Sequence, residues 1–251
     1  GSSISAPCEI ASFLTECVVQ TIPYNYDFET SGPLNCWNTV SGSACKIGYL
    51  TDLPDNHFLR TYKGVVTLPQ FNQEISNLEL TFQIRPYYYT DSYSRTFDVG
   101  YMTDPTDTST FVVVNTYNYS DWTSGSFMQK VEYFTNAPTG ACMALRTNGY
   151  SDDYRWYVDD VEVGVAPSCK VPNQLAATDI TTNSVKLNWT ARGSETAWNL
   201  YYKKVEDGSY TTISNVTAKP YTLTGLEANT EYQFYVTAVC GASYIELIFS
   251  I

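Results

Sequence analysis

The sequence predicts an all-β protein made of two β-sandwich domains. Short runs of alternating apolar and polar residues recur along the chain, and clusters of Gly, Asn, Ser and Thr separate them. From about residue 24 to residue 165 no stretch has a convincing helical period. A chain of 251 residues has room for two domains that each bury a core.

The charge divides the chain into an acidic first part and a neutral second part. Residues 1–169 carry 8 Lys and Arg against 19 Asp and Glu, whereas residues 170–241 carry 6 of each. An acidic domain repels phosphate backbones, which argues against nucleic acid as a partner. It suits cation binding, and the alternative is that the acids only keep an aromatic-rich surface soluble. No run approaches the roughly 18 apolar residues of a membrane span.

Strand candidates separated by polar turns fill the first domain. Turn signals return about every 8 to 15 residues, a spacing typical of an all-β sandwich. The candidates are FLRTYKGVVTL (58–68), SNLELTFQIRPYYY (76–89), TFDVGYMTD (96–104), STFVVVNTY (109–117), FMQKVEYFT (127–135), ACMALRTNG (141–149) and YRWYVDDVEVG (154–164).

The two ends of this domain carry a resemblance. It opens with IPYNYDFETSGPLNCWNTVSG and closes with YRWYVDDVEVGVAPSC. Both motifs resemble the jelly-roll modules of Bacteroidetes surface proteins, of the cleaved-adhesin and MAM-like type. The resemblance implies a jelly-roll β-sandwich over residues 1–166, lead-in included. Such jelly rolls serve as adhesins, carbohydrate-binding modules and accessory domains of enzymes.

The second domain shows its strands as Val185–Trp189, Trp198–Tyr202 and Tyr232–Val236. The run LTGLEANTEYQFYV places a Tyr after a turn, where its ring can hydrogen-bond back to the corner. Together with Trp189 and YVTAV, these residues resemble a fibronectin type III domain. Ala228 stands where that family usually has Pro, which should loosen the corner without changing the fold. We therefore expect a fibronectin type III sandwich over residues 167–251.

Seven cysteines stand at positions 8, 17, 36, 45, 142, 169 and 240, and none forms a C-x-x-C pair, which argues against structural zinc. Cys169 precedes the first strand of the second domain and Cys240 ends its sixth, so both lie at one pole and can form a disulfide. This predicts an oxidising, extracellular or cell-surface location. Cys8 with Cys17 and Cys36 with Cys45 are possible short loops, which would leave Cys142 single, although sequence alone does not decide connectivity.

Catalytic residues have no recognisable context. His57 is the only histidine and lies in DLPDNHFLR, which is typical of a turn that enters a strand. No G-x-S-x-G motif accompanies it, and no motif marks any pair of the many carboxylates as a glycosidase pair. The sequence therefore favours a protein that is not an enzyme.

The acids at the two domain ends predict a structural calcium ion. The first and last strands of a jelly roll usually lie side by side, which brings Asp27 and Glu29 close to Asp159 and Asp160. Calcium takes 6 to 8 oxygen ligands, and carboxylates supply them. The resemblance favours Glu29 and Asp160, with Asp159 as a further ligand. The alternative is that these acids discourage association of an edge strand.

The aromatic residues predict a ligand surface. Tyr alone numbers 22, and the run NTYNYSDWTSG combines rings with polar groups. Tyr117, Tyr119 and Asp121 alternate onto one side, and Trp122 follows. Rings of this kind stack on sugars, although they also fill sandwich cores.

These observations predict a non-catalytic extracellular protein of adhesion or ligand binding. Its partner would be a glycan or a host matrix protein at a bacterial surface. The competing prediction is an accessory segment, carbohydrate-binding or spacer, of a larger secreted hydrolase.

Overall fold

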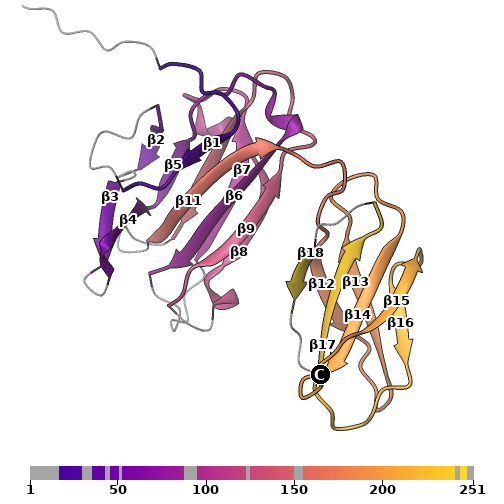
Figure 1. Ribbon diagram of the computed structural model, residues 1–251. Helices are drawn as coiled ribbons and strands as arrows, with labels where there is room; N and C mark the ends of the chain where they lie inside the picture. The colour runs from indigo at the N-terminus through magenta and orange to yellow at the C-terminus, as the bar shows by residue number, and fades with distance from the viewer. Residues whose placement is uncertain are drawn as a thin grey trace, which may run out of the picture. The chain divides into compact units, whose positions relative to one another are not determined.

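The computed structural model describes residues 17–29, 36–42, 46–50, 53–87, 95–122, 125–149, 155–240 and 244–247. The chain divides into two compact units, Gly1–Gly164 and Val165–Ile251. The regular structure of the described residues consists of eighteen strands and three short 3-10 turns, η1 (Ile75–Asn77), η2 (Thr108–Thr110) and η3 (Tyr119–Asp121), so the all-β prediction is confirmed (Figure 1). Among the described residues, no helix has the length and apolar character needed to span a membrane.

The first unit is a sandwich of two sheets. Its strands are β1 (Tyr24–Tyr26), β2 (Asn38–Gly42), β3 (Lys46–Leu50), β4 (Leu53–Thr61), β5 (Gly64–Thr67), β6 (Leu78–Pro86), β7 (Thr96–Met102), β8 (Phe111–Asn118), β9 (Met128–Tyr133), β10 (Cys142–Asn148) and β11 (Trp156–Val165). One sheet has the order β3-β4-β11-β6-β9, with β1 also paired to β11, and we name it the β11 sheet. The other, the β10 sheet, has the order β2-β5-β10-β7-β8.

The core of the first unit lies between these sheets, and β6 shows how the sequence specifies it. Leu78, Leu80, Phe82 and Ile84 are buried in the core, whereas the residues between them are only half buried. Side chains of a strand alternate between its faces, so every second residue of β6 faces outward. Each fully buried apolar side chain contributes about 1.5–3 kcal/mol, which fixes the register of the strand.

Strand β11 joins the two ends of the first unit. It pairs with β4 through Trp156–Val158 and with β1 through Val161–Val163. The prediction that the first and last strands lie side by side is thus confirmed. Between the two pairings, Asp160 has a φ of 45° and shifts the alternation by one residue, as a β-bulge does.

The run FLRTYKGVVTL is two strands in different sheets, contrary to the expected single strand. Strand β4 ends at Thr61 and β5 begins at Gly64, whose φ is 146°. A Cβ at Gly64 would lie 2.1 Å from the carbonyl oxygen of Ser41. The apolar pattern continues across this turn, so only the glycine marks the change of sheet.

The second unit is a separate sandwich with its own core. Its strands are β12 (Asn173–Thr178), β13 (Ser184–Thr190), β14 (Trp198–Lys204), β15 (Thr211–Val216), β16 (Tyr221–Thr224), β17 (Tyr232–Ala238) and β18 (Tyr244–Leu247). The sheets have the orders β12-β13-β16 and β15-β14-β17-β18. Trp189 and Trp198 pack edge to face in the core with ring centroids 5.6 Å apart.

The corner before β17 has the predicted form. Tyr232 is buried, and its hydroxyl oxygen accepts a hydrogen bond from the backbone N–H of Glu227 at 3.1 Å. The bond forms although Ala228 stands at the position where a proline is usual.

Two disulfide bonds are present among the described residues. Cys169 is bonded to Cys240, which confirms the prediction from topology. Cys17 is bonded to Cys36, so the suggested short loops from Cys8 to Cys17 and from Cys36 to Cys45 are wrong. Cys8 and Cys45 lie outside the described residues, and Cys142 is free and buried.

Candidate functional site

The outer face of the β11 sheet holds a polar hollow of about 450 Å³. Neighbouring strands supply its side chains because their outward residues align across the sheet: Asn25 of β1 lies opposite Glu162 of β11, and Gln83 of β6 lies opposite Gln129 of β9. The polar residues that line it are Asn25, Asp27, Thr81, Gln83, Gln129, Asp160 and Glu162. Amide, hydroxyl and carboxylate groups therefore converge on one concave surface.

The predicted acids lie at the rim of this hollow. Phe28 has a φ of 58° and is fully buried, so the turn leaves Asp27 and Glu29 on the outside. Asp27 and Asp160 line the hollow, while Glu29 lies close enough to Asp159 to affect its ionisation. The structure thus brings all four acids to one region at the β11 bulge.

Asp159 is the unusual member of this group because its side chain is buried. It is 4% exposed, and its Oδ1 accepts a hydrogen bond from the backbone N–H of Asp160 at 2.9 Å. Burial raises the pKa of Asp159 to about 7, and the charges of Asp160 and Glu29 add to the rise. A cation beside this carboxylate would favour its ionised form.

Calcium fits the chemistry of these groups but is not supported by their arrangement alone. Carboxylate and amide oxygens are suitable ligands. However, both carboxylate oxygens of Glu29 already contact His57, at 3.0 Å from its backbone N–H and 3.1 Å from Nδ1. Within the described part of the chain, no group of three or more His, Cys, Asp or Glu side chains is arranged to hold a metal ion.

His57 shows no catalytic arrangement in the described structure. It lies within β4, and Glu29 is the partner of both its backbone and its ring. Among the described residues, no serine, threonine or cysteine forms a hydrogen bond with the ring, so a nucleophile–histidine–acid constellation is not assembled there.

The aromatic run predicted to bind ligand lies largely in the core, and this corrects the prediction. Trp122 is 3% exposed and Tyr117 is 8% exposed, and both belong to the core cluster. The Trp122 ring packs edge to face on Trp156 at 5.2 Å. Tyr119 is half buried against the same cluster. Neither Tyr117 nor Trp122 is available for stacking on a sugar.

These side chains instead close the side of the sandwich between β8 and β9. The Tyr117 hydroxyl donates to the carboxylate of Glu132, which is fully buried and also accepts from Asn115 Nδ2 at 2.7 Å. Asp121 is exposed, and its Oδ2 accepts from the backbone N–H of Asn118 at 3.1 Å, capping η3. The run has a structural role because rings and hydrogen bonds join the two sheets there.

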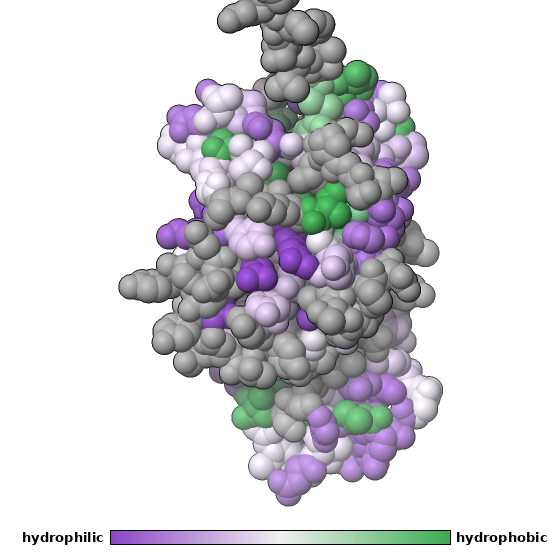
Figure 2. All heavy atoms as spheres, turned by 90° about the vertical axis from the view of Figure 1, so that its left-hand side faces the viewer, coloured by the Kyte–Doolittle hydropathy of each residue, from purple (hydrophilic) through white to green (hydrophobic). Residues whose placement is uncertain are grey.

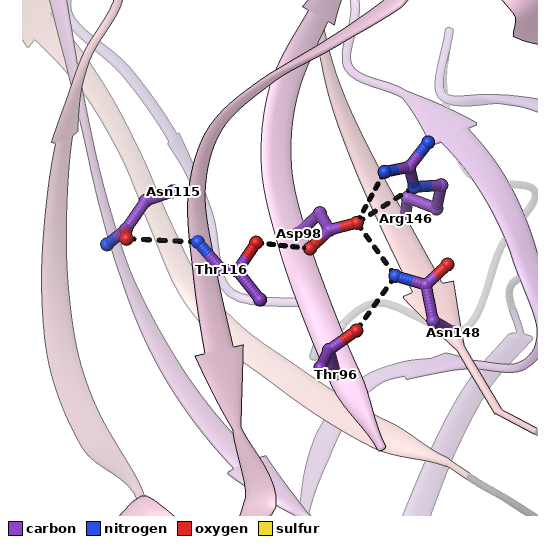
Figure 3. Close-up of polar contacts among 6 residues, drawn as sticks. All are labelled: Thr96, Asp98, Asn115, Thr116, Arg146 and Asn148. Atoms are coloured by element: carbon purple, nitrogen blue, oxygen red, sulfur yellow. Dashed lines mark hydrogen bonds and ion pairs between the residues drawn. The ribbon is translucent and has the colours of Figure 1, made fainter. Parts of the chain in front are cut away.

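A second polar cluster lies on the outer face of the β10 sheet, around Asp98 (Figure 3). Arg146 donates from Nε and Nη2 to Asp98 Oδ2 at 2.8 and 2.7 Å. Asn148 Nδ2 donates to the same oxygen at 2.7 Å, and Thr116 Oγ1 donates to Oδ1 at 2.7 Å. Asp98 is 3% exposed. The charged groups of Asp98 and Arg146 pair with each other. The cluster therefore stabilises the sheet and is not arranged to bind a ligand.

The residues of the hollow were missed by the sequence analysis, apart from Asp27 and Asp160. Asn25, Gln83 and Gln129 lie on three strands that are far apart in the sequence. The only local signal was the alternation of polar residues in β6, which marks an outward face without showing what lies beside it.

Residues 170–246 match the family model of the fibronectin type III domain. The second unit is a domain of this type. Among curated proteins none matches the chain.

Several solved structures are similar to parts of the chain. The K1 cleaved adhesin domain of Lys-gingipain from Porphyromonas gingivalis is 18% identical over 57% of this chain and 98% of its own, with a TM-score of 0.43. A fibronectin type III domain of human collagen XX is 21% identical over 35% of this chain and 98% of its own, with a TM-score of 0.29. The glycoside hydrolase domain of Endo-D from Streptococcus pneumoniae is 10% identical over 85% of this chain and 37% of its own, with a TM-score of 0.32. At these TM-scores the similarities assign no function.

Truncation of Trp122 should destabilise the first unit. We expect Trp122→Ala to lower its unfolding free energy by about 3–5 kcal/mol, because the ring leaves a cavity against Trp156. Scanning calorimetry of the whole chain resolves this if the first unit's transition falls while the fibronectin type III transition stays. Asp121→Ala is the matched control and should cost about 1 kcal/mol, the value of a cap. An unchanged transition for Trp122→Ala would contradict the core role.

Asp159 should make the first unit less stable at high pH. Its pKa is about 7 in the folded protein, above the ordinary value of 3.8, so the folded state holds the proton more tightly. The free energy of unfolding of the first unit should therefore fall as the pH rises from about 4 to 7, and it should stay at the lower value above pH 7. In chelator, Asp159→Asn should stabilise the unit by about 1–2 kcal/mol at pH 8 and have no effect at pH 4, allowing for partial solvent screening. Asp207→Asn, exposed in the other unit, should leave this transition unchanged at both pH values.

Proposed function

We propose that this chain is a non-catalytic extracellular binding protein of the adhesin type, and that its first unit binds a glycan in the polar hollow of the β11 sheet. The hollow is the observation that carries the proposal. Six polar side chains from four strands, together with Asp27 just after β1, surround a hollow of about 450 Å³. Amide groups donate to and accept from hydroxyl groups, and carboxylates accept from them, so such a lining suits a polyhydroxylated ligand.

A rigid sheet favours recognition of this kind. Gln83 and Gln129 are held opposite each other by the β6–β9 pairing, and Asn25 is held opposite Glu162 by the β1–β11 pairing. Side chains whose backbones are fixed lose less entropy on binding than side chains of mobile loops. Two disulfide bonds agree with an extracellular location.

A glycan is favoured over a host matrix protein by the character of the surface. Stable protein interfaces bury about 800 Å² on each partner around apolar and aromatic anchors. On the side of the molecule drawn in Figure 2, the coloured hydrophobic residues form only small separate groups among hydrophilic ones. The hollow itself offers no such anchor, because its apolar lining residues Tyr26, Phe82 and Val161 lie in the core or pack against it. The motifs at the ends of the first unit favour a bacterial surface as the location. An accessory segment of a secreted hydrolase would use the same hollow.

The fibronectin type III unit is proposed to be a spacer. Its aromatic residues Trp189, Trp198, Tyr232 and Phe234 are buried in its own core. These four rings therefore stabilise the fold and are not available to a ligand.

Glycan binding should depend on the two paired glutamines. Once a glycan array with the whole chain identifies a ligand, Gln83→Ala and Gln129→Ala should each weaken its Kd about tenfold, the loss of about one to two hydrogen bonds. Gln73→Ala, which removes an exposed glutamine outside the hollow, is the matched control and should bind as the wild type does. If the wild type and the three variants bind the glycan with equal affinity, the glycan does not bind in the hollow.

We further propose that calcium is a structural ion at the rim of the hollow, held by oxygen atoms of Asp27, Glu29, Asp159 and Asp160. Burial is the main cause of the raised pKa of Asp159, and the charges of Asp160 and Glu29 add to it; a cation beside these carboxylates would offset that repulsion. Saturating calcium should raise the melting temperature of the first unit and not of the second, since a ligand stabilises only the state it binds. Glu29→Gln and Asp160→Asn should each reduce that rise. If chelator leaves the wild-type transition unchanged and calorimetry detects no binding, the acids serve only as a charged rim.

A further inference from the structure

Two aromatic rings are buried on the outer face of the β11 sheet, beyond the end of the hollow. Phe58 is 0% exposed and Tyr157 is 1% exposed, with ring centroids 4.6 Å apart. Neither belongs to the core cluster between the sheets. Their neighbours Leu59, Trp156 and Val158 do, so Phe58 and Tyr157 point to the opposite, outer side.

Three arginines surround these rings. The Cζ atom of Arg85 lies 5.6 Å from the centroid of Tyr157 and 5.7 Å from that of Phe127. Arg155 Cζ lies 5.0 Å from the ring of Tyr87, and Arg60 Cζ lies 5.9 Å from the ring of Phe58. The cluster thus gathers three of the eight Lys and Arg residues present in residues 1–169.

The charges of these arginines are not balanced within the described part of the chain. No described carboxylate forms an ion pair with Arg60, Arg85 or Arg155, and their Nε atoms are buried with no hydrogen-bond acceptor. Arg60 Nη2 donates to the carbonyl oxygen of Tyr49, which is a neutral partner. Like charges that converge raise the energy of the folded state unless an anion joins them.

Arg146 shows what a balanced arginine in this unit looks like. Its Cζ lies 4.3 Å from the ring centroid of Phe111, and its guanidinium group donates two hydrogen bonds to buried Asp98 (Figure 3). The three clustered arginines have the aromatic contact, but no carboxylate of the described residues pairs with them. What they lack is therefore an acceptor of the kind that Asp98 provides.

Tyr157 does not provide the missing negative charge. Burial raises its pKa to about 12, against the opposing effect of Arg60, Arg155 and Arg85. The phenol therefore stays neutral at physiological pH. Within the described part of the chain, the positive charge of the cluster is therefore unbalanced, which suits an external anion.

We propose that Arg60, Arg85 and Arg155 form a binding site for the anionic group, a carboxylate or a sulfate ester, of an acidic glycan. Guanidinium groups match both anions because their N–H donors lie in a planar fork. Half-buried Tyr62 and Tyr87 lie beside Arg155, whose Cζ atom is 5.4 and 5.0 Å from their ring centroids. The choice of a glycan as carrier rests on the proposed function, whereas the anion site itself does not.

The anion site is continuous with the hollow. Gln83 and Arg85 are two residues apart on β6 and face the same side, at a spacing of roughly 7 Å. Phe127 and Gln129 follow the same spacing at the start of β9, and Arg85 lies over Phe127. One glycan can therefore place neutral hydroxyl groups at the glutamines and an acidic group at the arginines.

The first experiment tests the anion site with inorganic sulfate. Sulfate and chloride are compared at equal ionic strength by scanning calorimetry of the whole chain. Sulfate stabilises many proteins non-specifically, so the fibronectin type III transition is the internal reference. We expect the first unit's transition to rise more than the second in sulfate, by linkage to binding. Equal shifts of both transitions would overturn the anion site.

The second experiment identifies the source of the anion with three sugars that differ only at C6: galactose, galacturonic acid and galactose 6-sulfate. Nε–Hε signals of the arginines are followed by NMR during each titration. We expect Arg85 and Arg155 signals to shift with one or both acidic sugars and not with galactose.

Arg85→Gln and Arg155→Gln should each raise the Kd for the acidic sugar at least tenfold. Arg85→Lys should restore little of the affinity, because lysine lacks the planar fork of N–H donors.

Lys186→Gln is the control for net charge, since Lys186 is in a surface ion pair with Asp179 of the other unit. Its affinity should equal that of the wild type.

If the arginine variants fold poorly, the wild type is modified with phenylglyoxal instead, and galactose 6-sulfate should protect Arg85 and Arg155 from the reagent. Absence of both protection and signal shifts would show that the arginines only cover the rings. Gln83→Ala should retain the sulfate response, so a failure of the glycan proposal and a failure of the anion site are distinguishable.

Discussion

Strand β11 is the constraint on which the first unit depends. It pairs with β4 before the bulge at Asp160 and with β1 after it, so one strand holds both ends of the unit together. The bulge resets the alternation, which allows Trp156 and Val158 on one side of it and Val161 and Val163 on the other to face the same core. Without the extra residue, one of these pairs would point to solvent. The outward residues of β11 are consequently fixed as well.

The same strand sets the chemistry of the outer face. Tyr157 anchors the arginine cluster, Asp159 and Asp160 lie at the bulge, and Glu162 lines the hollow. A continuous strand therefore carries an aromatic and basic end, an acidic bulge and a polar groove in sequence. Their spacing cannot change without a change in the core register, which gives the face the rigidity that a specific binding surface needs.

The sequence predicted those features that depend on local pattern or on topology. Alternation in β6 and the tyrosine corner at Tyr232 are local, and the Cys169–Cys240 bond follows from counting strands. Features that depend on three-dimensional context were missed. The polar neighbours of Tyr117 and Trp122 suggested exposure, but the rings turn inward because β8 and β9 are the open edges of the two sheets. The arginine cluster draws on residues 60, 85 and 155, which no local motif connects.

Charge separation along the outer face has a consequence for any ligand. Glu79 and Arg85 face the same side of β6 six residues apart, roughly 20 Å, and burial together with nearby Glu162 raises the pKa of Glu79. Charges at that distance are largely screened at physiological salt, where the Debye length is about 8 Å, but not at low salt. The acidic end would therefore oppose an anionic ligand mainly at low ionic strength, and it would orient such a ligand with its acidic group toward the arginines. A cation bound at Asp159 and Asp160 would lower the net negative charge of the same face and so weaken this opposition. By linkage, calcium and an anionic ligand would then strengthen each other's binding, most strongly when the salt concentration is low.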